Sequence, residues 1–220
     1  MVVTILKHCS LIVLLKTTIF ILMKLFYSHT SPYARKVRLI ALEKGLADQV
    51  ETILVDTSAE NSELFAANPL GKIPTLILNN SEALFDSPVI CRYLDSISEP
   101  SLYPDNSWQL WAALRWEALA DGLLDAAYNL VMESRRPEGE KSPSNMTRWT
   151  TEIERTLRHI NANLAQLGEE IIIAQLALGA AIGYVDFRLS SLLRTGEYPQ
   201  LTTWYESFQQ RPSMQTTRPQ

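Results

Sequence analysis

The sequence predicts an α/β sandwich with a mixed sheet, of element order βαβαββα, followed by an all-α domain, and three observations lead to this fold class. Short apolar segments alternate with segments of helical period as far as residue 98. A segment with two prolines and no periodicity, 99–105, follows as a linker. Beyond it the strand signals end, and amphipathic helical segments fill the rest of the 220 residues. We therefore expect an α/β domain over 23–98 and an all-helical domain over 106–220.

The α/β domain is expected to begin with a short buried strand over 25–27, followed by a polar turn and a helix. Ser31 in front of Pro32 predicts the helix start, because serine caps the first turn and proline fits the first helical position. Gly45 is a plausible helix end. The later elements are expected as a strand over 50–56, a short helix over 61–67, strands over 75–78 and 83–85, and a helix over 88–97 with Ser87 as its cap.

Four helices are expected in the second domain, because apolar residues recur there at the helical period. They are predicted over 108–136, 147–167, 171–193 and 199–210. Tryptophans and Tyr128 at helical spacing on the first of them indicate a core or an interface more often than a ligand site.

Composition argues against several classes of function. A formal net charge of −4 gives no electrostatic footprint for nucleic acid. Two cysteines, Cys9 and Cys91, cannot form a disulfide framework, which favours a reducing cytoplasm. The histidines His8, His29 and His159 have no metal-ligand spacing, so we expect no metal. Cys91 lies on or near the apolar face of its helix and is expected to be a small buried hydrophobe, not a nucleophile.

Residues 1–22 form an apolar extension that is interrupted by Lys16. A signal peptide or membrane anchor is one interpretation. Against it, Lys16 falls inside the apolar core, no small-residue cleavage site precedes Lys24, and the first strand follows Met23 at once. We expect Met23 to be the true first residue, with an anchored or exported form as the alternative.

Three stretches resemble motifs of the glutathione S-transferase family, and the likeness covers nearly everything from Met23 onward. The stretch 28–38, SHTSPYARKVR, resembles the active-site strand-turn-helix of serine- and cysteine-type bacterial members. The stretch 68–74, NPLGKIP, is similar to the family's loop that ends in a cis-proline, and 84–90, LFDSPVI, to its acidic-serine loop. The resemblance implies a thioredoxin-like N-terminal domain that binds glutathione, a helical C-terminal domain that walls the electrophile site, and a cytosolic homodimer.

The resemblance assigns the thiol-activating position to Ser31. A free thiol titrates at about 8.5, so a hydroxyl donor and a helix N-terminus beside the sulfur would favour the thiolate. Thr30, on the same turn, is the alternative hydroxyl. Tyr33 and Tyr128 are possible residues of the electrophile site.

Five residues are implied to hold the tripeptide. A cis bond at Pro74 would turn the backbone N–H and C=O of Ile73 toward the cysteinyl backbone of glutathione. Lys72 matches a position that contacts the glycyl carboxylate in similar proteins. Asp86 can pair with the γ-glutamyl ammonium, while Ser87 and the start of its helix can take the γ-glutamyl carboxylate.

The implied function is a cytoplasmic glutathione transferase that conjugates the thiolate to small hydrophobic electrophiles, as in detoxification. One alternative is a non-catalytic ligand- or protein-binding module of the same fold. A thiol-disulfide transferase is disfavoured because a serine at position 31 cannot form a mixed disulfide.

One departure concerns the buried helix of the second domain. Related sequences usually begin this helix with a Ser/Thr-x-x-Asp capping box, and this chain has Ile172 and Gln175 there instead. Losing the box would cost about 0.5–2 kcal/mol. We expect either that another residue caps this helix or that the domain is less stable than its relatives.

Overall fold

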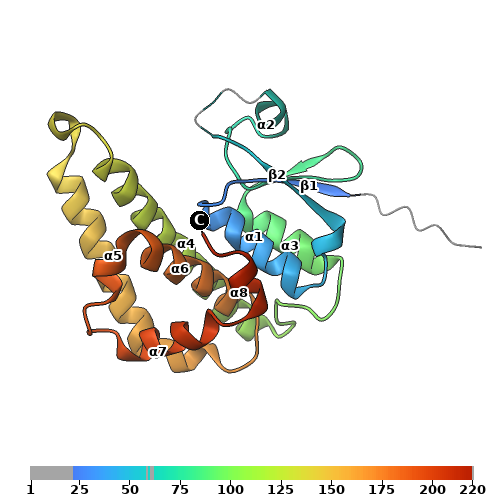
Figure 1. Cartoon of the computed structure of the whole chain (residues 1–220). Coiled ribbons are helices and arrows are strands. Elements are labelled where there is room, and N and C mark those ends of the chain that lie inside the picture. The colour runs from blue at the N-terminus through green and yellow to red at the C-terminus, as the bar shows by residue number, and fades with distance from the viewer. Residues whose placement is uncertain (1–21, 58, 60–61, 220) are drawn as a thin grey trace, which may run out of the picture.

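The computed structural model describes residues 22–57, 59 and 62–219. Apart from its last residue, the apolar extension predicted over 1–22 lies outside the described residues, as does Cys9. Figure 1 shows a small sheet with α1 and α3 on one side and α2 on the other, beside a group of longer helices.

The N-terminal part has the predicted order βαβαββα with one added 3-10 turn, η1. Its elements are β1 (Met23–Tyr27), α1 (Pro32–Glu43), η1 (Ala47–Gln49), β2 (Val50–Leu54), α2 (Ser62–Ala67), β3 (Thr75–Ile77), β4 (Ala83–Leu84) and α3 (Ser87–Ser96). The prediction that Ser87 caps α3 is wrong by one residue. Asp86 is the cap, because its backbone is extended and its carbonyl accepts the Ile90 N–H at 3.1 Å.

The strands form one mixed sheet in the order β2-β1-β3-β4, in which β1 and β2 are parallel and β3 is antiparallel to both of its neighbours. Phe26 lies opposite Thr75, and Leu76 lies opposite Leu84. The end of β1, the start of β3 and the end of β4 therefore meet at the same edge of the sheet. This edge receives the three loops that the sequence singles out.

The C-terminal part is helical, with the four predicted helices and a further short one. Its elements are α4 (Ser107–Ser134), η2 (Glu138–Glu140), α5 (Pro143–Asn163), η3 (Leu164–Leu167), α6 (Ile173–Leu193), α7 (Pro199–Phe208) and α8 (Pro212–Thr216). The start of α5 was predicted four residues too late, because Ser142 caps it by accepting the Asn145 N–H at 3.4 Å. The short α8, which begins at a proline, was not predicted.

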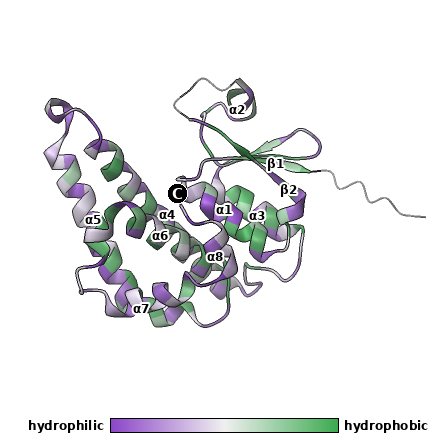
Figure 2. Ribbon diagram, in the orientation of Figure 1, coloured by the Kyte–Doolittle hydropathy of each residue, from purple (hydrophilic) through white to green (hydrophobic). Residues whose placement is uncertain are grey.

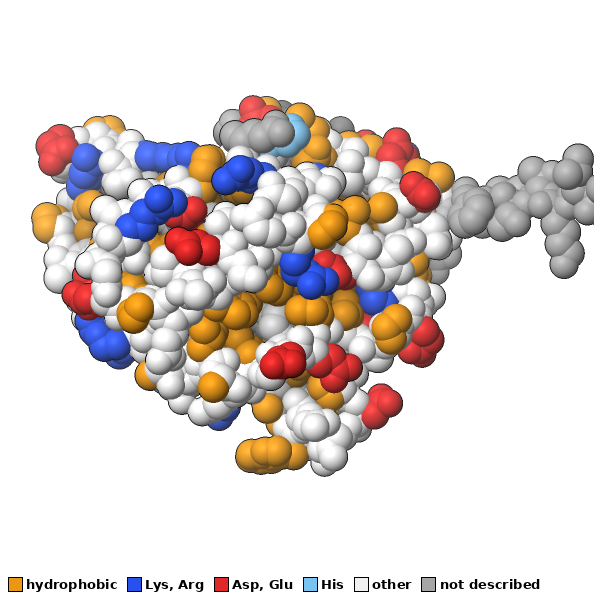
Figure 3. Space-filling model, turned by 60° about the horizontal axis from the view of Figure 1, so that its bottom comes forward, with side chains coloured by type: hydrophobic (Ala, Val, Ile, Leu, Met, Phe, Trp, Pro, Cys, Tyr) orange, Lys and Arg blue, Asp and Glu red, His pale blue; other side chains and the backbone are white. Residues whose placement is uncertain are grey.

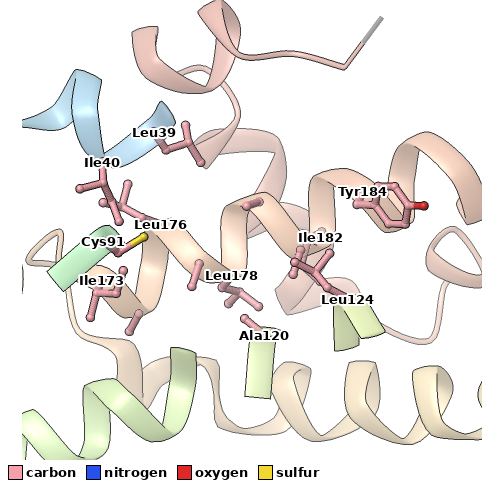
Figure 4. Packing of buried hydrophobic residues seen from close by; sticks show 14 of the residues in the cluster. Leu39, Ile40, Cys91, Ala120, Leu124, Ile173, Leu176, Leu178, Ile182 and Tyr184 are labelled. Carbon is pink, nitrogen blue, oxygen red and sulfur yellow. The ribbon is translucent and has the colours of Figure 1, made fainter. Parts of the chain in front are cut away.

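Helix α6 is the centre of the main core. Figure 4 shows Leu176 at the end of α6 that meets α1 and α3, and Leu178 and Ile182 further along, on the side of α4. Figure 2 shows hydrophobic residues concentrated on the strands and on α3. Within the described residues α6 is the one helix long and apolar enough to cross a membrane. Here its apolar residues pack inside the fold, which accounts for its composition.

The start of α6 keeps half of a capping box. Ile172 makes no side-chain hydrogen bond, but the Oε1 of Gln175 accepts the Ile172 N–H at 3.1 Å. The Nε2 of Gln175 donates to the carbonyls of Leu167 at 2.8 Å and Glu170 at 2.6 Å. Gln175 thus takes the place of the missing acid and also fixes the preceding loop, and the Ile173 N–H, the first of the helix, donates to the Leu102 carbonyl at 2.9 Å. The effect of this altered helix start on the stability of the domain stays a prediction.

The segment between α3 and α4 is tied to both of its neighbours. The carboxylate of Asp95, buried near the end of α3, accepts hydrogen bonds from Lys44 Nζ at 2.9 Å, Ser101 Oγ at 2.8 Å and the Leu102 N–H at 2.6 Å. Lys44 follows α1, so one buried carboxylate fixes α1, α3 and the connecting segment relative to one another.

Candidate active site

Ser31 caps the start of α1, as its sequence context predicts. Its backbone is extended, with φ −72° and ψ 116°, and its Oγ accepts the Ala34 N–H at 3.2 Å. Because the hydroxyl is used there as an acceptor, its proton remains available to donate to an anion. The half-buried hydroxyl lies at the positive end of the α1 dipole, so this position favours a negatively charged ligand atom.

The loop before β3 carries a cis peptide bond between Ile73 and Pro74. Among the described residues, the backbone N–H and C=O of Ile73 have no hydrogen-bond partner. Lys72 is exposed on the preceding loop, while its carbonyl accepts a hydrogen bond from Thr75 Oγ1 at 2.8 Å. Within the described part of the chain, the loop thus offers the Ile73 backbone pair and the Lys72 cation without partners.

Asn68 holds this loop in shape, and the sequence analysis did not assign it a role. Its side chain is 1% exposed, and its Nδ2 donates to the Lys72 carbonyl and to Thr75 Oγ1, both at 3.0 Å. Its Oδ1 accepts the Leu70 N–H at 3.0 Å. The available signal was the Asn-Pro pair at the head of the 68–74 motif, where a turn-forming asparagine is expected.

The sheet brings the predicted residues to one edge. When the register of β1, β3 and β4 is followed one residue past the paired strands, Tyr27, Pro74 and Phe85 lie in neighbouring positions. The turn with Ser31 follows Tyr27, and Asp86 follows Phe85. Asp86 is exposed and makes no capping hydrogen bond with its side chain, while Ser87 beside it is buried. The Ser31, Ile73 and Asp86 segments therefore face a common region.

Tyr33 lies on α1 and Tyr128 on α4, and a third tyrosine, Tyr184 of α6, lies near both. The hydroxyl of Tyr33 donates a hydrogen bond to Asp125 of α4. Burial raises the pKa of Tyr33 above its ordinary value, and the hydrogen bond to Asp125 and the charge of this carboxylate raise it further. Tyr184 could not be singled out from the sequence, because it stands in an apolar run that is typical of a core helix.

A buried ion cluster fixes α1 against α4. Lys36 is fully buried, and its Nζ lies 3.1 Å from Glu117 and 2.7 Å from Asp121. Burial alone would lower the pKa of Lys36, but the surrounding negative groups, Asp121 and Glu117 among them, raise it. Because α1 carries Ser31 and α4 carries Tyr128, this cluster sets how the two walls of the region face each other.

Cys91 of α3 has no exposed surface, and burial raises the pKa of its thiol above the ordinary value. A thiol that is buried and protonated is a poor nucleophile. The prediction that Cys91 is a buried hydrophobe is confirmed.

A family model for the glutathione S-transferase N-terminal domain matches residues 30–97. An uncharacterized GST-like protein, YibF of Escherichia coli (strain K12), is 31% identical over 201 residues, which are 90% of this chain and 98% of that relative. The chain belongs to the glutathione S-transferase family. It has that family's thioredoxin-like N-terminal domain with a mixed sheet, followed by a largely helical C-terminal region.

Two solved members of the glutathione S-transferase family resemble this structure over 90% of the chain, and both contain glutathione. The protein from Methylobacillus flagellatus KT is 40% identical, with all of its chain covered and a TM-score of 0.85. The family member from Pseudomonas fluorescens Pf-5 is 35% identical, with 99% of its chain covered and a TM-score of 0.86.

Proposed function

We propose that this protein is a cytoplasmic glutathione transferase in which the Ser31 hydroxyl stabilises the glutathione thiolate. The observation that carries the proposal is the hydroxyl proton of Ser31, which is free to donate at the N-terminus of α1. A donor hydrogen bond and the helix dipole both favour the charged form of the sulfur, so the pKa of the bound thiol falls and more thiolate is present at neutral pH.

The tripeptide is proposed to lie along the sheet edge. Its cysteinyl backbone pairs with the N–H and C=O of Ile73, at the cis bond to Pro74, as an added strand does. Lys72 binds the glycyl carboxylate, Asp86 the γ-glutamyl ammonium, and Ser87 with the start of α3 the γ-glutamyl carboxylate. The free backbone groups of Ile73, the exposed Asp86 carboxylate and the glutathione in two related structures support this placement.

The electrophile is proposed to bind between α1, α4 and α6, against Tyr33, Tyr128 and Tyr184. Their rings supply an apolar surface with few polar groups, which suits a small hydrophobic electrophile. The Asp125 carboxylate accepts a hydrogen bond from the Tyr33 hydroxyl, which keeps the ring in one orientation.

The test is the conjugation of glutathione to 1-chloro-2,4-dinitrobenzene by the full chain. Removing one preorganised donor costs about 100-fold or more in rate, so Ser31→Ala should lower kcat/KM by that factor. Ser31→Asp is the matched control for the helix cap, because aspartate caps a helix but cannot donate a proton and repels a thiolate. It should remain folded and be as inactive as Ser31→Ala.

Three results would redirect the proposal. Full conjugation activity in Ser31→Ala would contradict the role proposed for Ser31. If Thr30→Ala lost activity and Ser31→Ala did not, Thr30 would be the residue that stabilises the thiolate. Tight binding of glutathione without conjugation of this or any other electrophile would favour the non-catalytic binding module.

A homodimer is also proposed, because large apolar side chains stand on one end of α4. Trp108 and Trp111 are 78% and 63% exposed. Val89 and Ile97 of the α3 region are exposed as well, and Figure 3 shows hydrophobic side chains gathered in the middle of the face that it displays. Exposed apolar patches of this kind mark association surfaces. Light scattering should give twice the mass of one chain.

A further inference from the structure

A cavity of about 260 Å³ lies between α1, α6, α7 and α8. The proposed glutathione site does not use its residues. Those that matter to the argument are Arg35, Asp186, Phe187, Tyr205, Met214 and Arg218.

Arg35 is a buried cation that has no counter-charge among the described residues. It is 5% exposed, its Nε donates to Thr217 Oγ1 at 3.3 Å, and its Nη2 donates to the Met214 carbonyl at 3.1 Å. Its Nη1 makes no hydrogen bond of normal geometry within the described residues, although the Tyr205 hydroxyl lies beside the guanidinium. No carboxylate of the described residues forms an ion pair with it. Burying an unpaired charge is costly, so such a group is normally matched by an anion.

The walls of the cavity add a further positive charge. Arg218 is exposed on the wall and its side chain makes no hydrogen bond within the described part of the chain. Asp186 is the one acidic residue among the described lining residues, and its carboxylate is already paired with Arg194 through contacts of 3.0 and 2.7 Å. The cavity therefore has an excess of positive charge.

Gly183 allows Arg35 to occupy this position. A Cβ at residue 183 would come within 2.2 Å of the Arg35 Nη1. Any amino acid other than glycine at position 183 would therefore displace the guanidinium. The Tyr205 hydroxyl lies beside the same group and also lines the cavity. Polar donors are thus gathered at the inner end, while the Phe187 ring and the Met214 thioether supply apolar surface.

We propose that this cavity binds a small carboxylic acid in its anionic form. Arg218 and Tyr205 would donate hydrogen bonds to the carboxylate, Arg35 would supply the buried positive charge, and Phe187 would contact the apolar body of the ligand. A guanidinium can bind a carboxylate through two hydrogen bonds, and the apolar surface of Phe187 and Met214 favours an organic acid over an inorganic anion. The proposal does not depend on the chemistry at Ser31.

The probe is benzoate, titrated calorimetrically into the full chain with glutathione present at saturation. Benzoate should bind at one saturable site per chain, and the neutral isostere benzamide should not bind. Arg218→Gln should weaken benzoate binding by about tenfold, since a hydrogen bond to a charged group is lost. Arg218 is exposed, so this variant is expected to fold.

The control is Arg155→Gln, which removes the same charge from the exposed surface of α5 and should change benzoate affinity by less than about twofold. Absence of saturable benzoate binding would overturn the proposal. Equal losses in both variants, or benzoate binding that appears only when glutathione is left out, would also do so. Inorganic phosphate that bound more tightly than benzoate, with the same dependence on Arg218, would overturn the assignment to carboxylates.

Discussion

Gln175 is predicted to contribute unusually strongly to stability for a single glutamine. It is 2% exposed and satisfies three backbone groups, the Ile172 N–H and the carbonyls of Leu167 and Glu170. Gln175→Ala leaves all three without this partner. At about 1 kcal/mol for each lost hydrogen bond, the free energy of unfolding should fall by roughly 3 kcal/mol, or by about 6–12 °C in Tm for a chain of this size.

The assay is equilibrium unfolding in urea, followed by tryptophan fluorescence at a fixed protein concentration. Gln166→Ala is the matched control, because Gln166 is exposed and its amide donates only to Asn163 among the described residues, at 2.8 Å. It should change stability by less than about 0.5 kcal/mol. Gln175→Glu keeps the acceptor but places an anion against two carbonyls, so it should destabilise at least as much as alanine. Equal stabilities of Gln175→Ala and Gln166→Ala would refute the reasoning.

Two further predictions concern residues that fix the surroundings of the site. Burial alone would raise the pKa of Glu43, but hydrogen bonds from Arg211, at 2.7 and 3.1 Å, and from Ser213 hold this pKa below its ordinary value of 4.5. The contribution of ionised Glu43 to the free energy of unfolding is then fully present above pH 4.5 and is lost as the pH falls through the lowered pKa. The destabilisation by Glu43→Gln, about 1–2 kcal/mol at pH 7, should shrink in acid-unfolding experiments; a pH-independent difference would contradict the assignment. Asn68→Ala should weaken glutathione binding about tenfold in calorimetry, because the loop that presents Ile73 loses the hydrogen bonds of the Asn68 side chain. Asn80→Ala, in an exposed turn, is the control and should leave the affinity unchanged. Equal affinities in the two variants would count against a role for Asn68.

The element order and the helix start at Ser31 could be predicted from the sequence because each depends on local chemistry. Apolar periodicity identifies strands and helices, and a Ser-Pro pair marks a helix start wherever it occurs. Element ends were less predictable. Ser142 is a capping serine followed by a proline, as Ser31 is, yet the helix was expected four residues later, at the point where its apolar period becomes clear. The cap of α3 was misplaced because Asp86 and Ser87 are both good caps.

The parts of the site that were missed depend on contacts between residues distant in the sequence. Lys36 meets Glu117 and Asp121, which are more than eighty positions away, at separations of 81 and 85. Tyr184 is near Tyr33 only because α6 packs against α1 and α4. No local pattern marks such residues, since a lysine in an amphipathic helix reads as a solvated charge and a tyrosine in an apolar run as core.

The first two turns of α1 combine several separate tasks in what reads as a single motif. Ser31 offers its hydroxyl to the proposed thiolate site, Tyr33 bonds to Asp125, Arg35 points toward the C-terminal helices, and Lys36 is held by α4. Successive residues of a helix are about 100° apart, so neighbouring positions must face different parts of the fold. The resemblance to the family over this stretch therefore comes from residues that hold α1 in the fold as well as from the residue proposed to bind the thiolate. Ser31 can be tested by substitution because its partner is a ligand, whereas removing Lys36 would leave two carboxylates unpaired in the interior and alter every wall of the site at once.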